Sequence, residues 1–282
     1  MARGRKDTNT PQPVVRTAAE LRAEGHTPWT LARAVREGTL VRVRRGRYTL
    51  PGHPEEILAA ARIGGRLDCV SLLSLCGVFV LERQEPHVQL DPSASRRPRL
   101  AEGARRHWRP SDAAPEELVV GMVEALVQSV RCQPPRAAIA TLDSAWNLDL
   151  VDEQDIDEVF SRLPARFRVL RPLLDRRSEA GTETLVRLMV RALGCDVRLQ
   201  VRIRGVGRVD LLVDGWLIIE CDSRQFHGGW EEHRNDRRRD LAALGLGYAT
   251  LRLLAEDVLF HPERVQASLA AVIARGAPSP NR

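Results

Sequence analysis

Two apolar stretches on either side of Asp214-Gly215 constrain the fold of this chain more than any other feature. The first runs from Arg208 to Val213 and the second from Trp216 to Asp222, and both are rich in Val, Leu and Ile. Such residues favour strands, and an intervening Asp-Gly favours a tight turn. The pattern predicts a β-hairpin, yet acidic residues interrupt both of its apolar strands.

Alternation of side chains along a strand decides where these acids point. In the first strand Asp210 shares a face with Leu212, and in the second Glu220 shares a face with Asp222. Matching the fully apolar faces puts all three acids on one side. A two-residue turn would break this match, whereas an odd-numbered loop or a bulge, with Gly215 in the left-handed region, restores it. We therefore expect a bulged hairpin that gathers three carboxylates.

Gathered carboxylates share protons or bind a hard cation through their oxygens. We expect Asp210 and Glu220 to be direct ligands of Mg²⁺ or Mn²⁺. Glu183, from a predicted helix that precedes the hairpin, completes the site directly or through water. The alternative is that Asp210 and Asp222 are charges at a strand edge, neutralised by Arg208, Arg224 or the following helix.

These acids resemble a known nuclease motif. Glu183, Val209-Asp210 and Glu220-Cys221-Asp222 are similar to the PD-(D/E)XK nuclease core. A closer similarity, spanning Ser178 to about Pro262, is to uncharacterised bacterial proteins related to very-short-patch-repair endonucleases. It implies a restriction-endonuclease-like mixed sheet flanked by helices, hydrolysis of DNA phosphodiesters, and Asp210 as the central metal ligand. The residues that carry it are Glu220-Cys221-Asp222-Ser223-Arg224-Gln225-Phe226-His227, Asp236-Arg237-Arg238-Arg239-Asp240-Leu241 and Gly247-Tyr248-Ala249-Thr250-Leu251-Arg252.

One position departs from the general motif. The lysine expected two residues after the glutamate is Asp222, and Lys6 is the only lysine in the sequence. The closer family also tends to have an acid there. His227 is then a candidate general acid or base, because imidazole titrates near neutral pH, and Gln225 is a candidate to orient water or phosphate. The expected catalytic residues are Glu183, Asp210, Glu220, Asp222, Gln225 and His227.

Residues 14–51 predict a DNA-binding unit. A short helix from Thr17 to Glu24 precedes a second helix that starts at Thr27-Pro28, and a basic hairpin follows. This is the order of a winged helix-turn-helix, and eight arginines against three acids leave a net charge of +5. The alternative is a small helical cap whose arginines are simply solvated. The arginines of a predicted helix near 230–244 have the same alternative, a solvated charged face. The expected DNA contacts are Arg33, Arg36, Arg42, Arg44, Arg45, Arg47, Arg237 and Arg238.

A second resemblance supports this unit. Ala23-Glu24-Gly25, the stretch from Leu31 to Leu40, and Arg44-Arg45-Gly46-Arg47-Tyr48 resemble the N-terminal winged helix of type IV antitoxins of the abortive-infection class. The resemblance implies a DNA-binding regulator with a possible toxin partner. A non-catalytic, antitoxin-like transcriptional regulator with a degenerate nuclease fold is therefore the alternative function. A protein-interaction scaffold would leave the basic hairpin unexplained.

The rest of the chain predicts little chemistry. Five cysteines are scattered without a CxxC pair, which favours neither a zinc ribbon nor a disulfide framework but small buried thiols in a reducing compartment. The apolar stretch from Cys69 to Leu81 is too short to span a membrane. We expect a cytoplasmic protein with DNA as partner, no membrane, and a possible homo-oligomer.

The overall expectation is a multi-domain α/β (α+β) protein. Its middle domain should contain helices near 54–63, 69–79, 115–131, 134–147 and 152–162, with strands near 86–90 and 105–109. The predicted boundaries are a disordered lead at 1–13, the winged helix at 14–52, the middle domain at 53–175, the nuclease domain at 176–275 and a disordered tail at 276–282.

Overall fold

The computed structural model describes residues 13–82, 85–93, 103–222 and 230–277. The described residues form a mixed α+β fold with three sheets. The chain divides into two compact units, the first comprising 1–133 and 149–168 and the second 134–148 and 169–282. Within the described ranges, every helix is too short or too polar to cross a bilayer.

The first unit begins with two helices and a hairpin, in the order that the sequence predicts. Thr27 caps α2 and Pro28 occupies its first turn, so this helix starts where the sequence signals placed it. Gly46, with φ of 71°, makes the turn of the hairpin. The three strands have the order β1-β3-β2. The elements are β1 (Arg16–Thr17), α1 (Ala18–Ala23), α2 (Pro28–Arg36), β2 (Val41–Arg44) and β3 (Arg47–Thr49).

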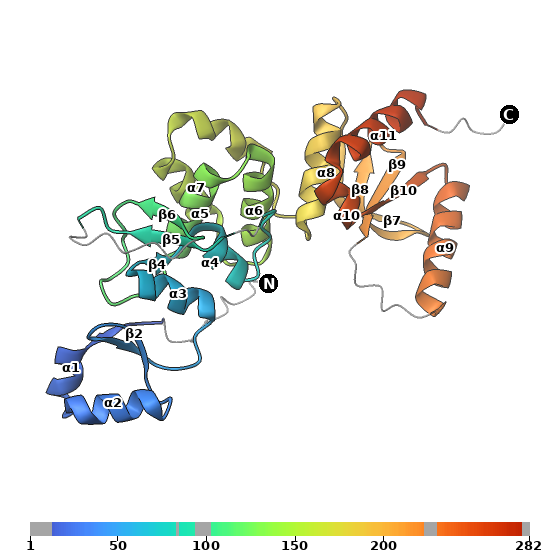
Figure 1. The fold of residues 1–282 in the computed structure, drawn as a ribbon. Helices are drawn as coiled ribbons and strands as arrows, with labels where there is room; N and C mark the ends of the chain where they lie inside the picture. Colours follow the sequence, from blue (N-terminus) through green and yellow to red (C-terminus); the bar gives the residue numbers. More distant parts are fainter. Residues whose placement is uncertain (1–12, 83–84, 94–102, 223–229, 278–282) are drawn as a thin grey trace. The chain divides into compact units, whose positions relative to one another are not determined.

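The remainder of the first unit combines helices with a second sheet, of order β4-β5-β6 (Figure 1). Helix α5 begins at Met122, later than predicted, because Leu67 hydrogen-bonds to Leu118 and Val120 and holds that segment extended. Strand β4 was not predicted. The elements are α3 (Glu55–Ile63), β4 (Arg66–Leu67), α4 (Cys69–Leu75), β5 (His87–Leu90), β6 (Arg105–Trp108), α5 (Met122–Cys132) and α7 (Glu153–Arg162).

The second unit is built on a four-stranded sheet of order β10-β9-β8-β7. Strand β10 runs parallel to β9, and the other pairs are antiparallel. Helices α8, α10 and α11 gather on one side of the sheet and α9 on the other (Figure 1). The elements are α6 (Pro135–Asn147), 3-10 helix η1 (Ala165–Leu173), which follows α7 from the first unit, α8 (Gly181–Ala192), β7 (Val197–Ile203), β8 (Gly207–Val213), β9 (Leu217–Asp222), α9 (Trp230–Gly245), β10 (Ala249–Leu254), α10 (Ala255–Phe260) and α11 (Pro262–Arg275).

Helix α6 corrects a predicted boundary. The sequence placed residues 134–147 in the middle domain, but the structure groups this helix with the second unit. The reason is a buried ion pair: Asp143 of α6 accepts hydrogen bonds from Arg187 at 2.6 Å and from Thr184 at 2.9 Å, both on α8. A buried arginine requires its carboxylate nearby, so this pair fixes α6 against α8.

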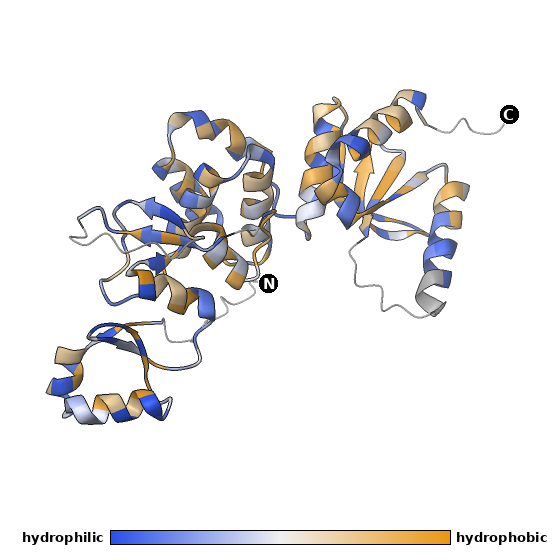
Figure 2. Ribbon diagram, viewed as in Figure 1, coloured by the Kyte–Doolittle hydropathy of each residue, from blue (hydrophilic) through white to orange (hydrophobic). Residues whose placement is uncertain are grey.

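The hairpin of β8 and β9 has the register that the acids require. Val213 pairs with Leu217 and Leu211 with Ile219, which leaves a three-residue loop, Asp214–Trp216. Asp214 and Gly215 both have positive φ, 47° and 75°. The odd-numbered loop is thus confirmed, and no bulge interrupts the paired residues. Figure 2 shows the strands of this sheet as mainly hydrophobic, so its acids lie in apolar surroundings.

Candidate functional site

Asp210 and Glu220 lie where the pairing of β8 and β9 ends. The ladder runs as far as Leu211 and Ile219, and its register places Asp210 opposite Glu220. Beyond that point the backbone N–H of Cys221 donates to the Asp210 carboxylate at 3.0 Å. The Asp210 side chain therefore takes the place of a backbone carbonyl as the acceptor for the Cys221 N–H, and this hydrogen bond fixes the orientation of the carboxylate.

Gln200, which the sequence did not suggest as a site residue, lies beside these two acids. Leu199 pairs with Leu211 and Val201 with Val209, so Gln200 of β7 lies opposite Asp210. Gln200 has a φ of 51°, an unusual conformation for a strand residue, and this position is skipped in the ladder. The register of the β7–β8 hairpin was the signal that would have found it. We call the three acids Asp210, Glu220 and the nearby Glu183, together with the amide of Gln200, the carboxylate row.

Glu183 joins the row from the first turn of α8. Its carboxylate accepts hydrogen bonds from the backbone N–H of Glu179 at 2.9 Å and from Nε2 of Gln200 at 3.0 Å. The side chain is buried, and burial raises its pKa to about 7, with the charge of Asp210 adding to the effect. Glu183 is therefore close enough to Asp210 for their charges to interact, and its part in a metal site stays a prediction.

The charge of the row is only partly neutralised. Burial raises the pKa of Glu220 to about 7, and Asp210 raises it further, although Arg239 and Arg252 oppose the change. Burial also raises the pKa of Asp222, while Arg252 lowers it. Carboxylates that hold protons near neutral pH are carboxylates with too little positive charge around them. The row therefore favours the uptake of a proton or a cation.

Two arginines contact the acids. Arg239 of α9 donates to Glu220 Oε1 at 3.1 Å, and its guanidinium is anchored by the backbone oxygens of Val206 at 3.0 Å and Arg208 at 2.7 Å. Arg252 lies 3.5 Å from Asp222 Oδ1 and also pairs with acids of α9. The alternative of edge charges neutralised by arginine therefore applies to Asp222, through Arg252, whereas Asp210 accepts a hydrogen bond from the Cys221 N–H.

Other expected site residues are placed differently or not at all. Arg208 pairs with Glu179 at 2.6 Å, so it serves a different acid from the predicted one. Arg237 and Arg238 are exposed on α9, where contact with a phosphate is open to them. Gln225, His227 and Arg224 lie outside the described residues.

The arginines of the first unit that were expected to contact DNA lie on α2 and on the hairpin of β2 and β3. Arg33 and Arg36 are exposed on α2, beside Trp29, whose side chain is 64% exposed and lies under the Arg33 guanidinium at 5.8 Å. Arg42 and Arg45 are exposed on the hairpin. Exposed arginines beside an exposed aromatic ring suit a nucleic-acid surface.

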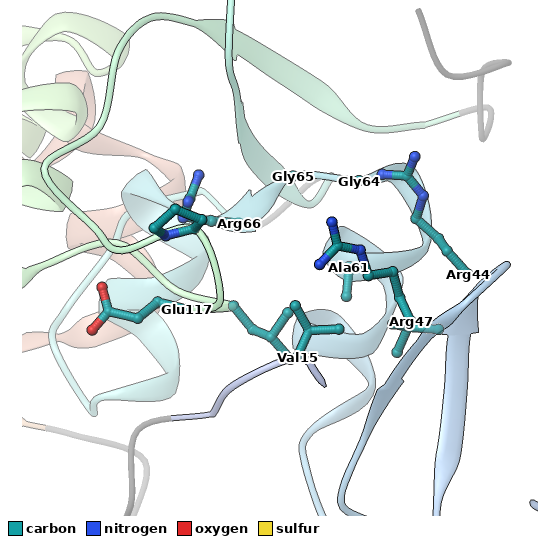
Figure 3. Close-up of a pocket in the computed structure, with 11 residues that line it drawn as sticks. Val15, Arg44, Arg47, Ala61, Gly64, Gly65, Arg66 and Glu117 are labelled. Atoms are coloured by element: carbon teal, nitrogen blue, oxygen red, sulfur yellow. The ribbon is translucent and has the colours of Figure 1, made fainter. Parts of the chain in front are cut away.

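Arg44 and Arg47 instead line a cavity of about 130 Å³, with Arg66, Gly64 and Glu117 (Figure 3). A Cβ atom added to Gly64 would come within 1.8 Å of Arg44 Nη1, so the guanidinium lies directly against this glycine. Arg66 is engaged with the backbone, donating to the oxygen of Ala114 at 2.8 Å. Both arginines are also exposed, so the DNA contacts expected at Arg44 and Arg47 stay predictions.

The first unit contains a group of metal-ligating side chains that the sequence spacing did not suggest. Cys69, His87, His107 and Cys132 each offer one ligand atom, and these atoms all lie within 4.8 Å of one another. In the part of the chain that the structure describes, it is the one such group. The absence of a CxxC pair ruled out a zinc ribbon, but tertiary structure brings together ligands from α4, β5, β6 and α5. This Cys/His cluster can bind a metal.

Contacts inside the cluster are close. His107 Nε2 lies 3.2 Å from His87 Nδ1 and 3.8 Å from Cys132 Sγ, and Gln128 Nε2 donates to the same sulfur at 3.2 Å. Burial raises the pKa of the Cys69 thiol well above its usual range. Hydrogen bonds from Cys69 and the two histidines lower the pKa of Cys132. The two thiols of the cluster therefore differ in their surroundings, with the hydrogen bonds converging on Cys132.

Comparison with known proteins finds relatives but no described function. No family model matches the chain. Two uncharacterised proteins, from two strains of Mycobacterium tuberculosis, are each 28% identical over 255 residues. The match covers 84% of this chain and 93% of each relative. A match of that length includes parts of both units.

Proposed function

We propose that the second unit is a metal-dependent deoxyribonuclease domain that hydrolyses DNA phosphodiesters, and that the N-terminal helices and hairpin act as a winged helix that positions it. The observation that carries this proposal is the carboxylate row: Asp210 and Glu220 face each other across two strands where pairing ends, with Glu183 beside them. The resemblance to the PD-(D/E)XK core assigns metal binding to the same acids.

The row fits a divalent cation with oxygen ligands. Burial, with the charge of Asp210, raises the pKa values of Glu183 and Glu220 to about 7. Gln200 Oε1 is buried without a hydrogen-bond partner among the described residues. Asp210 and Glu220 would hold Mg²⁺ or Mn²⁺, with Glu183 joining directly or through water. Bound there, the ion would make a coordinated water more acidic and offset charge on the phosphate.

The protein groups around the row have positioning roles. The Cys221 N–H orients Asp210, and Gln200 Nε2 orients Glu183. Arg239 is the cation fixed beside Glu220, in a site whose motif lysine is replaced by Asp222. We assign to Arg239 the part of that lysine: it balances Glu220 when no metal is bound, and it stabilises charge on the phosphate during cleavage.

DNA binding is assigned to α2 and the hairpin of the first unit. Trp29, Arg33 and Arg36 form an exposed surface on α2, and Arg42 and Arg45 extend it onto the hairpin. Arginines that neutralise phosphates release counterions, so binding should weaken steeply as salt rises. The resemblance to antitoxin winged helices supports this assignment.

Cleavage assays test the enzymatic proposal. The full chain is incubated with supercoiled plasmid or single-stranded DNA and Mg²⁺ or Mn²⁺, beside Asp210→Asn and Glu220→Gln. We expect cutting by the wild type and a loss of about 100-fold or more in each variant, as for other groups that stabilise transition-state charge. Glu263→Gln, an exposed acid of α11 outside the row, is the matched control. Equal cutting by all four proteins indicates a contaminating nuclease.

The second candidate is a non-catalytic, antitoxin-like transcriptional regulator. The observation that favours it is the Arg239–Glu220 pair at 3.1 Å, which places a guanidinium beside a proposed metal ligand. The same samples separate the two functions. If the wild type binds DNA in a salt-dependent manner yet cuts nothing with either metal, the enzymatic proposal fails and the regulator stands. The double variant Arg33→Ala/Arg36→Ala should abolish DNA binding whichever of the two functions is correct.

A further inference from the structure

We propose that Cys69, His87, His107 and Cys132 bind one Zn²⁺ ion, which holds the helices and the sheet of the first unit together. The four ligands belong to that unit alone. The inference does not depend on the nuclease proposal, because it shares no residue with the carboxylate row.

The separations of the ligand atoms suit a tetrahedral zinc site. Zinc binds imidazole nitrogen at about 2.0–2.1 Å and thiolate sulfur at about 2.3 Å, so neighbouring ligand atoms are about 3.3–3.8 Å apart. The nitrogens of His87 and His107 are 3.2 Å apart, and His107 Nε2 is 3.8 Å from Cys132 Sγ. All four ligand atoms lie within 4.8 Å of one another. The side chains therefore already approximate a zinc tetrahedron.

The donor set selects zinc rather than the hard cations. Two sulfurs and two imidazoles are soft or borderline ligands, whereas Mg²⁺ and Ca²⁺ take oxygen. Four protein ligands complete the coordination of zinc and leave no position for substrate, which is the mark of a structural site. Cys69, His87 and His107 are buried and Cys132 is half-buried, so most of the site is shielded from solvent. Each thiol that is still protonated releases its proton on binding.

The surroundings hold the ligands for a purpose other than packing. Cys69 has a φ of 55°, a strained conformation for a residue with a side chain. Its backbone N–H is fixed by Asp68 Oδ1 at 2.6 Å, and Asp68 is in turn held by Arg109 at 2.7 Å. Gln128 donates to the Cys132 sulfur from one helical turn away. Such outer contacts orient metal ligands in known sites, and the sulfur of Cys69 lies within 4.8 Å of the other three ligand atoms.

The ion would connect four elements, three of them at an end. Cys69 is the first residue of α4, His87 the first of β5 and Cys132 the last of α5, with His107 on β6. Buried thiols and imidazoles with no metal are polar groups that the core would have to accommodate at a cost. Zinc turns the same groups into a cross-link between two helices and the sheet.

Metal analysis of the full chain, purified without chelators, tests the inference. Zinc and iron contents are measured by mass spectrometry, and cobalt is then titrated into the metal-free protein to record the absorption of a tetrahedral thiolate complex. We expect one zinc ion and no iron per chain. Cys132→Ser and His107→Asn should lose the zinc and the thiolate bands, while Cys76→Ser, an exposed cysteine outside the cluster, should keep both.

Several outcomes would overturn it. These are a wild type that binds cobalt without thiolate bands, a Cys132→Ser variant with unchanged zinc content, or a native disulfide between Cys69 and Cys132. If the ligand variants fail to fold, the cobalt spectrum of the wild type still decides the matter. Asp210→Asn should retain its zinc, so failure of the nuclease proposal and failure of the zinc proposal are separate results.

Discussion

The Cys/His cluster and the carboxylate row are both groups of potential metal ligands, but they are built on opposite principles. In the cluster, four ligand atoms lie within 4.8 Å of one another in a buried site. In the row, each acid is engaged by a protein donor instead: Asp210 by the Cys221 N–H, Glu220 by Arg239 and Glu183 by Gln200.

The difference follows from charge. Thiols and imidazoles can be neutral, so they approach one another without repulsion, whereas carboxylates repel until a cation or a proton is present. A closed set of four protein ligands suits a structural ion, and a set with open positions suits one that handles water and substrate. If both proposals hold, one group of ligands stabilises the fold and the other binds the ion that acts on substrate.

The Asp143–Arg187 pair completes the comparison within the second unit. Both side chains are almost fully buried, and they lie 2.6 Å apart. Glu183, also on the buried side of α8, is held by two neutral donors instead. The same helix therefore pairs one acid permanently and leaves another with its charge uncompensated, which marks Glu183 as the acid available to a cation.

Removal of zinc should have the largest effect. A structural zinc contributes on the order of 10 kcal/mol in small domains, and about 1 kcal/mol moves the Tm of a domain of this size by 2–4 °C. We expect a strong chelator to lower the Tm of the first unit by about 10 °C or more, with recovery on adding Zn²⁺ but not Mg²⁺. Calorimetry measures this. Recovery with Mg²⁺ alone would erase the distinction between the two groups.

Asp143→Asn should be the next most damaging change. It leaves Arg187 buried without its counter-charge, which typically costs about 3–5 kcal/mol. Urea unfolding followed by circular dichroism measures the loss. Glu179→Gln is the control, because that acid pairs with Arg208 where both side chains are about half exposed, and should cost less than about 1 kcal/mol from the ion pair. Similar losses in the two variants would show that the buried pair has no special role.

Metal-free stability should depend on pH through Glu183. Its pKa rises from 4.5 to about 7 on folding, so the folded state holds a proton that the unfolded state has lost between these values. The contribution is present below about pH 4.5 and is lost as the pH rises toward 7.

Glu183→Gln should reduce the change in the free energy of unfolding between low and neutral pH by up to about 3 kcal/mol, because each pKa unit corresponds to about 1.4 kcal/mol. Urea unfolding of metal-free protein at pH 5 and pH 8 checks it. Mg²⁺ should stabilise the wild type at pH 8 more than the variant. If the variant has the same pH dependence of stability as the wild type, Glu183 is not the group that causes this dependence.

Arg239→Gln should have the smallest effect on binding. Losing the guanidinium beside Glu220 removes a competitor for the metal, so the Mg²⁺ concentration at half-maximal cutting should fall a few-fold, about 1 kcal/mol. The rate at saturating Mg²⁺ should fall as well, because the same group stabilises the phosphate. A higher Mg²⁺ requirement would show that Arg239 supports metal binding instead of opposing it.

Local signals were sufficient for the hairpins and helices that frame both units. Thr27-Pro28 predicted the start of α2, and the alternation around Asp214-Gly215 predicted an odd-numbered loop that puts Asp210 opposite Glu220. These features depend on residues close in the chain, where capping, side-chain alternation and positive φ act directly. The start of α5 was missed because long-range hydrogen bonds to Leu67 override local helix propensity.

What the sequence by itself determined is therefore the pairing of Asp210 with Glu220, since strand parity places them on one face. Only the tertiary structure decided the place of Gln200, the attachment of α6 to α8 through Asp143 and Arg187, and the reach of Arg44 into a cavity. It also decided the Cys/His cluster, whose ligands come from four separate elements. Periodicity reports which face a residue occupies, but contacts between distant elements arise from packing, which no local pattern encodes.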